Sequence, residues 1–291
     1  MSNFVHIPVL LKAAVDGLNV CPGKVFIDGT AGGGGHTQEI LKRGGKVLAI
    51  DCDTDAIEHL RDVFKNEKMV KIVKGNFSKI GQIVRENGFF PVDGVLFDLG
   101  FSSYQIDEAG RGFSFRKDEK IDMRMDSDTT LTAFDIVNTW SKDALYELFS
   151  KVGEEHDAQK IADEIVFVRK NGNIEISREL GDIVKKVKKE YGGMMHPATK
   201  VFQALRITVN NELENLKTGL FEGVSVLRKN GRFGVISFHS LEDRIVKREF
   251  LSFEKNGIGR IITKKPITAD DKEIENNVRS RSAKLRFFEI V

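Results

Sequence analysis

Two aspartates and a run of glycines are the residues of this sequence with the clearest chemistry. Asp28 ends the apolar segment 24–28, Gly32–Gly35 follow it, and Asp51 ends the next apolar segment, 46–51. In doubly wound sheets, an acid about 20 residues after a glycine-rich turn binds the ribose hydroxyls of a nucleoside cofactor, and the glycines let the backbone approach that ligand. The spacing therefore predicts a nucleoside cofactor site.

The glycine pattern limits which cofactor this is. G-x-G-x-x-G fits in no register, since Thr37 stands where a glycine would have to follow Gly32 and Gly34. A P-loop is excluded because His36 occupies the place of its phosphate-binding lysine. The carboxylate of Asp28 would repel a pyrophosphate, but it suits the positively charged methionine moiety of S-adenosylmethionine. The sequence thus favours S-adenosylmethionine over NAD.

Strand and helix patterns alternate in the segments that would position these residues. Strand candidates cover 24–28, 46–51, 70–74, 93–98 and 231–239, and helical patterns at 37–42 and 55–64 separate the first three. This alternation predicts a parallel sheet with crossover helices. Asn230-Gly231 is interpreted as a helix stop before the fifth strand. Segments 260–264 and 284–291 are expected to form a closing antiparallel pair.

A long, mostly helical stretch separates the fourth strand from the fifth. About 130 residues lie between them, whereas a crossover needs only a dozen or more. Helical spacing of apolar residues is present at 131–138, 141–150, 154–169 and 177–189, and again after Pro197. We therefore expect a sheet domain of residues 1–104 and 216–291 with an inserted helical domain of residues 105–215.

The site should lie beyond the carboxyl ends of the strands, as in other open α/β sheets. Asp28, Asp51 and Asp98 end three of the predicted strands, Phe77 follows a fourth, and His239 ends the fifth. The ring of Phe77 is a candidate for stacking on adenine. His239 is a candidate site residue on position alone.

The residues just after the strands narrow the choice of methyl acceptor. Methylation of carbon 5 of a pyrimidine needs a cysteine nucleophile, and none follows the fourth or fifth strand. An exocyclic amine needs only acceptors that orient it and free its lone pair for in-line attack. Asp98 and the loop that contains Ser102 and Ser103 are the expected catalytic groups.

Arginine and phenylalanine alternate further along the chain, at Arg111, Phe113, Phe115, Arg116 and Arg124. Aromatic side chains stack on unpaired bases and arginines bind phosphates, so these residues are candidates for RNA contact. A structural loop held by Arg–Asp pairs explains the same composition equally well. The basic residues between 244 and 286 leave the same choice between RNA contact and a solvated face.

Several long motifs together resemble the MraW family of ribosomal RNA methyltransferases. They are Asp28-Gly-Thr-Ala-Gly-Gly-Gly-Gly-His36, Phe97-Asp-Leu-Gly-Phe-Ser-Ser103, Asp122-Met-Arg-Met-Asp126, Phe202-Gln-Ala-Leu-Arg-Ile-Thr-Val-Asn-Asn-Glu-Leu213 and Ser237-Phe-His-Ser-Leu-Glu-Asp-Arg244. The resemblance implies a class I, Rossmann-like methyltransferase with an inserted helical domain. It also implies methyl transfer from S-adenosylmethionine to N4 of a decoding-centre cytidine in 16S rRNA.

The resemblance further implies roles for individual residues. The implied cofactor contacts are Gly34, Gly35, His36, Asp51, Phe77, Asp98 and Gln105. Composition and position, rather than the resemblance, give the expected substrate-binding residues Arg111, Phe113, Arg116, Arg124 and His239.

Composition and termini complete the expectations. The net charge is only +2, and Cys21 and Cys52 are expected to be reduced thiols. We expect a cytoplasmic protein without a signal peptide, a membrane partner or a metal, acting on the small ribosomal subunit; a homodimer is compatible with the sequence. An NAD-type oxidoreductase and a non-catalytic, RNA-binding assembly factor are the alternatives, and a DNA N4-cytosine enzyme is disfavoured because its Pro-Pro-aromatic tripeptide does not follow Asp98.

Overall fold

The computed structural model describes residues 8–100, 110–188 and 196–291. The chain divides into two compact units, one formed by residues 1–100 with 213–291 and the other by residues 101–212. We refer to them as the sheet unit and the helical unit.

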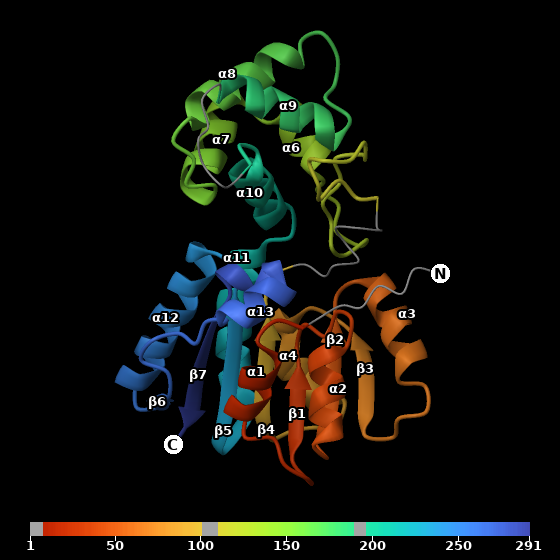
Figure 1. Cartoon of the computed structure of the whole chain (residues 1–291), viewed down its shortest axis with the longest axis vertical. Helices are drawn as coiled ribbons and strands as arrows, with labels where there is room; N and C mark the ends of the chain where they lie inside the picture. Colours follow the sequence, from red (N-terminus) through yellow and green to blue (C-terminus); the bar gives the residue numbers. More distant parts are fainter. Residues whose placement is uncertain (1–7, 101–109, 189–195) are drawn as a thin grey trace. The chain divides into compact units, whose positions relative to one another are not determined.

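Strands of the sheet unit form one mixed sheet in the order β3-β2-β1-β4-β5-β7-β6 (Figure 1). The parallel strands are β1 (Val25–Asp28), β2 (Lys46–Asp51), β3 (Val70–Lys74), β4 (Val92–Asp98) and β5 (Leu227–Ser237). The antiparallel strands are β7 (Lys284–Ile290), next to β5, and β6 (Gly259–Ile261). The predicted doubly wound α/β sheet with a closing antiparallel pair is confirmed.

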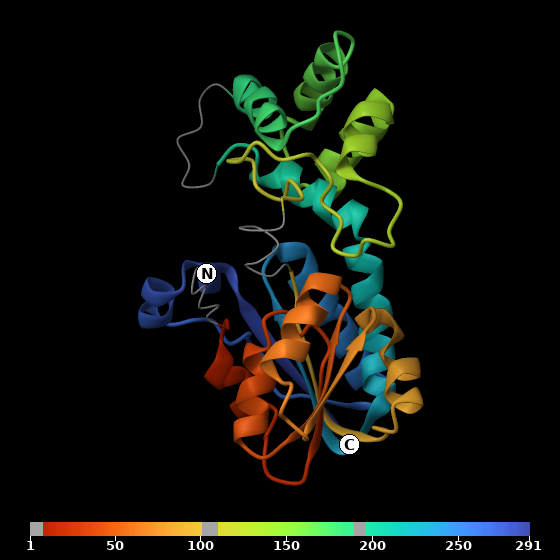
Figure 2. The same cartoon turned by 90° about the vertical axis from the view of Figure 1, so that its right-hand side faces the viewer.

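Helices cover both faces of this sheet (Figure 2), and two clusters of buried apolar side chains fill the layers between the helices and the sheet. One face carries α1 (Leu11–Gly17), α2 (Gly35–Lys42) and α3 (Thr54–Val63). The other carries α4 (Ile80–Glu86), α11 (Glu212–Val226) and α12 (Ser240–Lys255). Because both faces are covered, the central strands are continuous apolar runs, and Val47–Ile50 of β2 is fully buried. Two short elements, η1 (Phe77–Lys79) and α13 (Asp271–Asn276), lie in connections.

The predicted helix stop at Asn230-Gly231 is wrong. Helix α11 ends at Val226, and β5 begins directly at Leu227, so both residues lie inside the strand. The pairing of β4 with β5 jumps there from Val92↔Leu227 to Gly94↔Arg232, and Asn230 has a left-handed φ of 61°. Asn-Gly suits this bulge for the same reason that it suits a helix end, namely its tolerance of positive φ.

The helical unit has its own apolar core, built from residues such as Phe149, Ile161, Leu180 and Leu205. Its helices are α6 (Ala133–Thr139), α7 (Lys142–Glu147), α8 (Ala158–Val168), α9 (Ser177–Val187) and α10 (Thr199–Val209), with a π-helical turn, η2 (Leu148–Val152), after α7. All five were expected, but α8 starts at Ala158, after Glu154, which has a left-handed φ of 47°.

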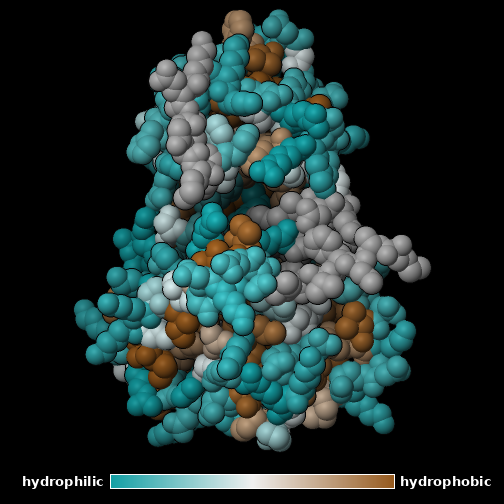
Figure 3. Space-filling model, viewed as in Figure 1, coloured by the Kyte–Doolittle hydropathy of each residue, from teal (hydrophilic) through white to brown (hydrophobic). Residues whose placement is uncertain are grey.

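The visible surface is mostly hydrophilic, with hydrophobic residues in separate patches (Figure 3). Within the described ranges, no helix is both long and apolar enough to span a membrane.

Candidate active site

Three carboxyl groups gather at the carboxyl edge of the sheet. Asp28, Asp51 and Asp98 end β1, β2 and β4, and β1 pairs in parallel with both neighbours. The neighbouring strands are about 5 Å apart. Asp28 pairs with Ala49 and Leu96, so Asp51 and Asp98 lie two residues further along their strands than the partners of Asp28.

A glycine turn leads from β1 into α2 next to these acids. Gly34 precedes the helix with a φ of 81°, and a Cβ at this position would lie 2.8 Å from the ring of Phe64. A Cβ at Gly35 would overlap Pro8. Both positions thus require glycine, because side chains of the protein itself occupy the space that a Cβ would need.

Asp51 holds the turn in place. Its carboxylate accepts hydrogen bonds from the backbone N–H groups of Gly32 (2.8 Å) and Asp53 (2.9 Å). Burial outweighs these bonds and raises the pKa of Asp51 to about 6. A carboxylate oxygen can accept more than one hydrogen bond, so Asp51 retains capacity for ribose hydroxyls.

Asp28 is the most buried of the three acids, with 1% of its surface exposed. Burial raises its pKa to about 6, although the Thr37 hydroxyl donates to it at 2.7 Å, and the nearby Asp51 adds to the shift. Thr37 directly follows the motif Asp28–His36 in the sequence, but its pairing with Asp28 becomes visible only in the folded turn.

Asp98 combines burial with an unused acceptor. Its Oδ1 is buried and has no hydrogen-bond partner among the described residues, while Oδ2 lies 3.6 Å from Nδ1 of His36. Burial raises the pKa of Asp98 well above its usual value, and the charges of Asp28 and Glu242 raise it further. The backbone N–H of Asp98 donates to the Thr30 hydroxyl at 2.6 Å, which fixes the end of β4.

His36 is buried between Asp98 and the segment before α1. Its Nε2 lies 3.2 Å from the carbonyl oxygen of Val9. With the proton on Nε2, the lone pair of Nδ1 faces Asp98. The position agrees with the implied cofactor contact, which remains a prediction.

Three neighbouring carboxyl groups with raised pKa values suit a cationic ligand. A positively charged group with N–H or O–H donors would relieve the mutual repulsion and fill the unused oxygen of Asp98. S-adenosylmethionine has these features in its sulfonium, ammonium and ribose hydroxyls, and the glycine turn lies next to the acids.

The other predicted site residues differ in what the structure places around them. The half-buried ring of Phe77 packs on Phe97, with centroids 4.7 Å apart, so only part of it remains for a base. His239 caps α12, where its Nδ1 accepts from the N–H of Glu242 at 3.3 Å.

Ser102, Ser103 and Gln105 lie outside the described residues. Glu242 was not predicted; its buried carboxylate, which accepts from the N–H of Phe238 at 2.7 Å, marks it as part of this region.

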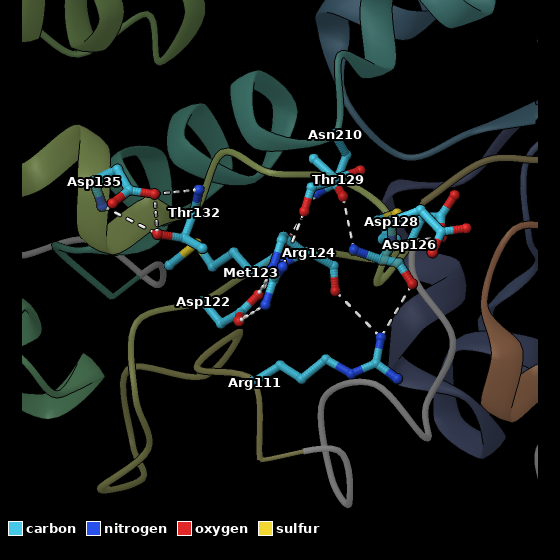
Figure 4. A network of polar contacts seen from close by, with 11 residues as sticks. Arg111, Asp122, Met123, Arg124, Asp126, Asp128, Thr129, Thr132, Asp135 and Asn210 are labelled. Atoms are coloured by element: carbon cyan, nitrogen blue, oxygen red, sulfur yellow. Dashed lines mark hydrogen bonds and ion pairs between the residues drawn. The ribbon is translucent and has the colours of Figure 1, made fainter.

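The arginine-rich stretch forms a hydrogen-bonded loop within the helical unit (Figure 4). Arg124 binds both carboxylate oxygens of Asp122 at 2.8 and 2.7 Å and the carbonyl of Thr129 at 2.9 Å. Arg111 donates to the carbonyls of Arg124 and Met125 at 3.2 and 3.1 Å. These contacts favour the structural-loop interpretation for Arg111 and Arg124, and their RNA contacts remain predictions.

Asn210 ties this loop to the end of α10. Its side chain donates to the carbonyl of Met123 at 2.8 Å and accepts from the N–H of Met125 at 2.7 Å. One amide thus satisfies two backbone groups of a segment that lacks regular structure.

The remaining substrate candidates differ in exposure. Phe113 packs against the core of the helical unit, and Phe115 stacks on His196 with the ring centroids 4.1 Å apart. Arg116 is exposed, and its guanidinium makes no hydrogen bond or ion pair within the described part of the chain. Of the C-terminal basic residues, Arg286 is buried, and its Nε donates to Oδ1 of Asp243 at 2.7 Å. Its guanidinium is therefore already paired with a carboxylate rather than exposed to a phosphate.

The strand order, the antiparallel last strands, the glycine turn after β1 and the acid ending β2 together define a class I, Rossmann-like methyltransferase. Comparison with known protein families identifies one family. The model of the MraW methylase family matches residues 3–291, and the chain belongs to this family. S-adenosylmethionine is therefore the cofactor, as the sequence predicted, and an NAD-type oxidoreductase is excluded.

Curated relatives are similar over nearly their whole length. Ribosomal RNA small subunit methyltransferase H of Clostridium botulinum (strain Loch Maree) is 43% identical, covering 97% of this chain and 98% of the relative. The protein of the same name from Brevibacillus brevis is 41% identical, covering 99% and 98%. A solved rRNA methylase structure from Streptococcus thermophilus aligns over 99% of each chain at 10% identity, with a TM-score of 0.47.

The raised pKa of Asp98 predicts how the stability of the ligand-free protein depends on pH. Because the folded protein holds this proton more tightly than the unfolded chain, Asp98 lowers the free energy of unfolding as pH rises above about 4. Asp98→Asn should therefore raise the Tm at pH 8 by a few degrees, since about 1 kcal/mol shifts Tm by roughly 2–4 °C in a chain of this size. The difference should shrink toward pH 4.5. Thermal unfolding followed by circular dichroism measures both.

Asp62→Asn is the control, because the Asp62 side chain is 79% exposed. It should leave the Tm unchanged at both pH values. A lower Tm for Asp98→Asn at pH 8 would contradict the assignment.

The loop contacts predict different effects for two arginines. Arg124→Ala removes three hydrogen bonds and leaves Asp122 without the partner that lowers its pKa against the effect of burial. Its unfolding free energy should fall by about 1–3 kcal/mol. Arg116→Ala should change it by less than about 0.5 kcal/mol. Urea unfolding compares the two, and equal losses would show that the loop does not depend on Arg124.

Proposed function

We propose that this chain transfers a methyl group from S-adenosylmethionine to N4 of a decoding-centre cytidine in 16S rRNA. The observation that carries the proposal is the buried Oδ1 of Asp98, which has no hydrogen-bond partner in the described part of the chain and lies near the glycine turn and two further carboxyl groups. The names of the relatives support a ribosomal RNA substrate in the small subunit.

Cytidine N4 is favoured over carbon 5 by the residues available. Carbon-5 transfer needs a thiolate that attacks the pyrimidine ring. The only cysteines of the sequence, Cys21 and Cys52, follow neither β4 nor β5. An amine with an adjacent acceptor can react without a covalent intermediate.

In this mechanism the residues bind and orient. Asp51 accepts hydrogen bonds from the ribose hydroxyls, and the turn at Gly34 and Gly35 allows the cofactor to approach the backbone. When bound, S-adenosylmethionine supplies an electrophilic methyl group. Asp98, ionised when a cationic ligand lies beside it, accepts an N–H of the cytosine amine, directs the nitrogen lone pair along the line of attack and takes the proton that the nitrogen releases. Asp28 contributes negative charge that favours a cationic ligand.

The helical unit is proposed to hold the RNA. The target base must leave its stack, which costs a few kcal/mol, so contacts with flanking nucleotides have to offset this cost. Arg116 is a candidate from the arginine-rich stretch because its guanidinium is exposed. The substrate would place the enzyme in the cytoplasm.

Mass analysis of small-subunit rRNA tests the reaction. In cells that lack this protein, one N4-methyl mark on a 16S cytidine should disappear. The wild-type chain should restore it, and Asp98→Asn should not. Unchanged rRNA would contradict the proposed substrate, and restoration by Asp98→Asn would favour a non-catalytic assembly factor or another acceptor, such as the Ser102–Ser103 loop.

Cofactor affinity tests the role of Asp51. Asp51→Ala should weaken S-adenosylmethionine binding by about 1.5–3 kcal/mol, the range for hydrogen bonds to a charged group. The wild-type affinity should fall as pH drops below about 6, because the pKa of Asp51 is about 6 and the protonated acid is a poorer acceptor. Titration calorimetry at pH 8 and pH 5.5 measures both effects, with Asp62→Ala as the control. Equal affinity in a folded Asp51→Ala variant would reject the assignment.

A further inference from the structure

A groove on the helical unit has features that methyl transfer does not use. Helix α8 packs against both α7 and α9, and a depression of about 860 Å³ opens along it. We call it the Phe167 groove, because Phe167 lines it together with Lys142, Lys160, Lys170 and Lys186.

Phe167 lies outside the apolar core. Ile161 and Ile165 on the inner side of α8 are fully buried, whereas 60% of Phe167 is exposed. In the helix, Lys160 and Phe167 are seven residues apart and share a face. An aromatic ring turned to water forgoes much of its hydrophobic stabilisation. Its free face is available to a flat partner.

The groove is positively charged, whereas the helical unit as a whole is negatively charged. Residues 101–212 contain 17 Lys and Arg against 20 Asp and Glu, so the unit as a whole is acidic. The groove instead has four lysines against two acids, Asp163 and Glu164. Positive charge is thus concentrated around the exposed ring.

The acids occupy only part of the hydrogen-bonding capacity of the lysines. Lys142 pairs with Asp163 at 3.2 Å and Lys186 with Glu164 at 2.7 Å. These lysine side chains are 48% and 67% exposed, and each ammonium has three donors. Lys170 forms no ion pair among the residues described. Exposed pairs of this kind are weak and can be shared with a phosphate.

We propose that the Phe167 groove binds a single-stranded segment of the RNA substrate. One base stacks on Phe167, and the phosphates on either side are bound by Lys142, Lys170 and Lys186. An aromatic platform flanked by cations is the arrangement by which proteins hold unpaired strands. The inference rests on the proposed RNA substrate, and it adds a binding site separate from the carboxyl groups that receive the cofactor.

The test is the affinity of the full-length protein for an unmodified 16S rRNA transcript. Phe167→Ala should raise the Kd about 5- to 100-fold, the range for loss of one base–aromatic stack. The double variant Lys142→Ala/Lys170→Ala should weaken binding and reduce the slope of log K against log salt by about 1.4, or about 0.7 for each cation removed. Binding of S-adenosylmethionine should be unchanged in both.

Matched controls come from the sheet unit. Phe221 on α11 is 65% exposed, and the ion-paired Lys217 has the same 48% side-chain exposure as Lys142. Phe221→Ala and Lys217→Ala should bind the transcript like the wild type. Ultraviolet cross-linking with small subunits should attach the peptide that contains Phe167 to RNA.

The outcomes separate this inference from the proposed reaction. If both groove variants bind the transcript like the wild type, or if Phe167 cross-links to a ribosomal protein instead, the groove assignment is overturned while N4 methylation can stand. If the variants lose RNA affinity but the rRNA mark does not depend on this protein, the groove assignment stands and the reaction does not. A wild-type protein with no affinity for the transcript overturns the groove assignment.

Discussion

The burial of three carboxyl groups at neighbouring strand ends is the constraint on which this site depends. Parallel pairing of β1 with β2 and β4 brings Asp28, Asp51 and Asp98 to neighbouring strand ends, and burial raises the pKa of each. Hydrogen bonds from surrounding polar groups offset part of the energetic cost of burying these carboxyl groups. Thr37 and the backbone of the glycine turn donate to two of the acids, while an oxygen of Asp98 stays without a partner among the described residues. A cationic ligand with hydrogen-bond donors would offset the negative charge of these acids and could donate to the oxygen of Asp98.

Much of the sheet unit could be predicted because its signals are local. Four of the parallel strands were placed to within about one residue, since parallel strands covered on both faces are continuous apolar runs. The error at Asn230-Gly231 has a physical origin. Tolerance of positive φ marks a helix end and a β-bulge alike, and only the partner strand distinguishes them.

Side-chain partnerships in the site and in the arginine-rich stretch could not be predicted from spacing. The burial of Glu242 near Asp98 depends on how β5 leads into α12, more than 140 residues beyond Asp98 in the sequence. The composition around Arg111 and Arg124 suited RNA contact and a structural loop equally. The choice required the carbonyls of Met125 and Thr129 and the amide of Asn210, which the fold brings within hydrogen-bonding distance.

Glu242 performs two tasks that evolution cannot vary independently. Its carboxylate accepts backbone N–H groups at the start of α12, and its negative charge helps to keep a proton on Asp98. A glutamine at this position could retain an acceptor for the helix start while changing the acidity of a residue on another strand. Selection on the beginning of a helix and selection on the chemistry of the site therefore act on the same side chain. We therefore expect few amino-acid types to be tolerated at position 242, even though this residue is far along the chain from the glycine turn.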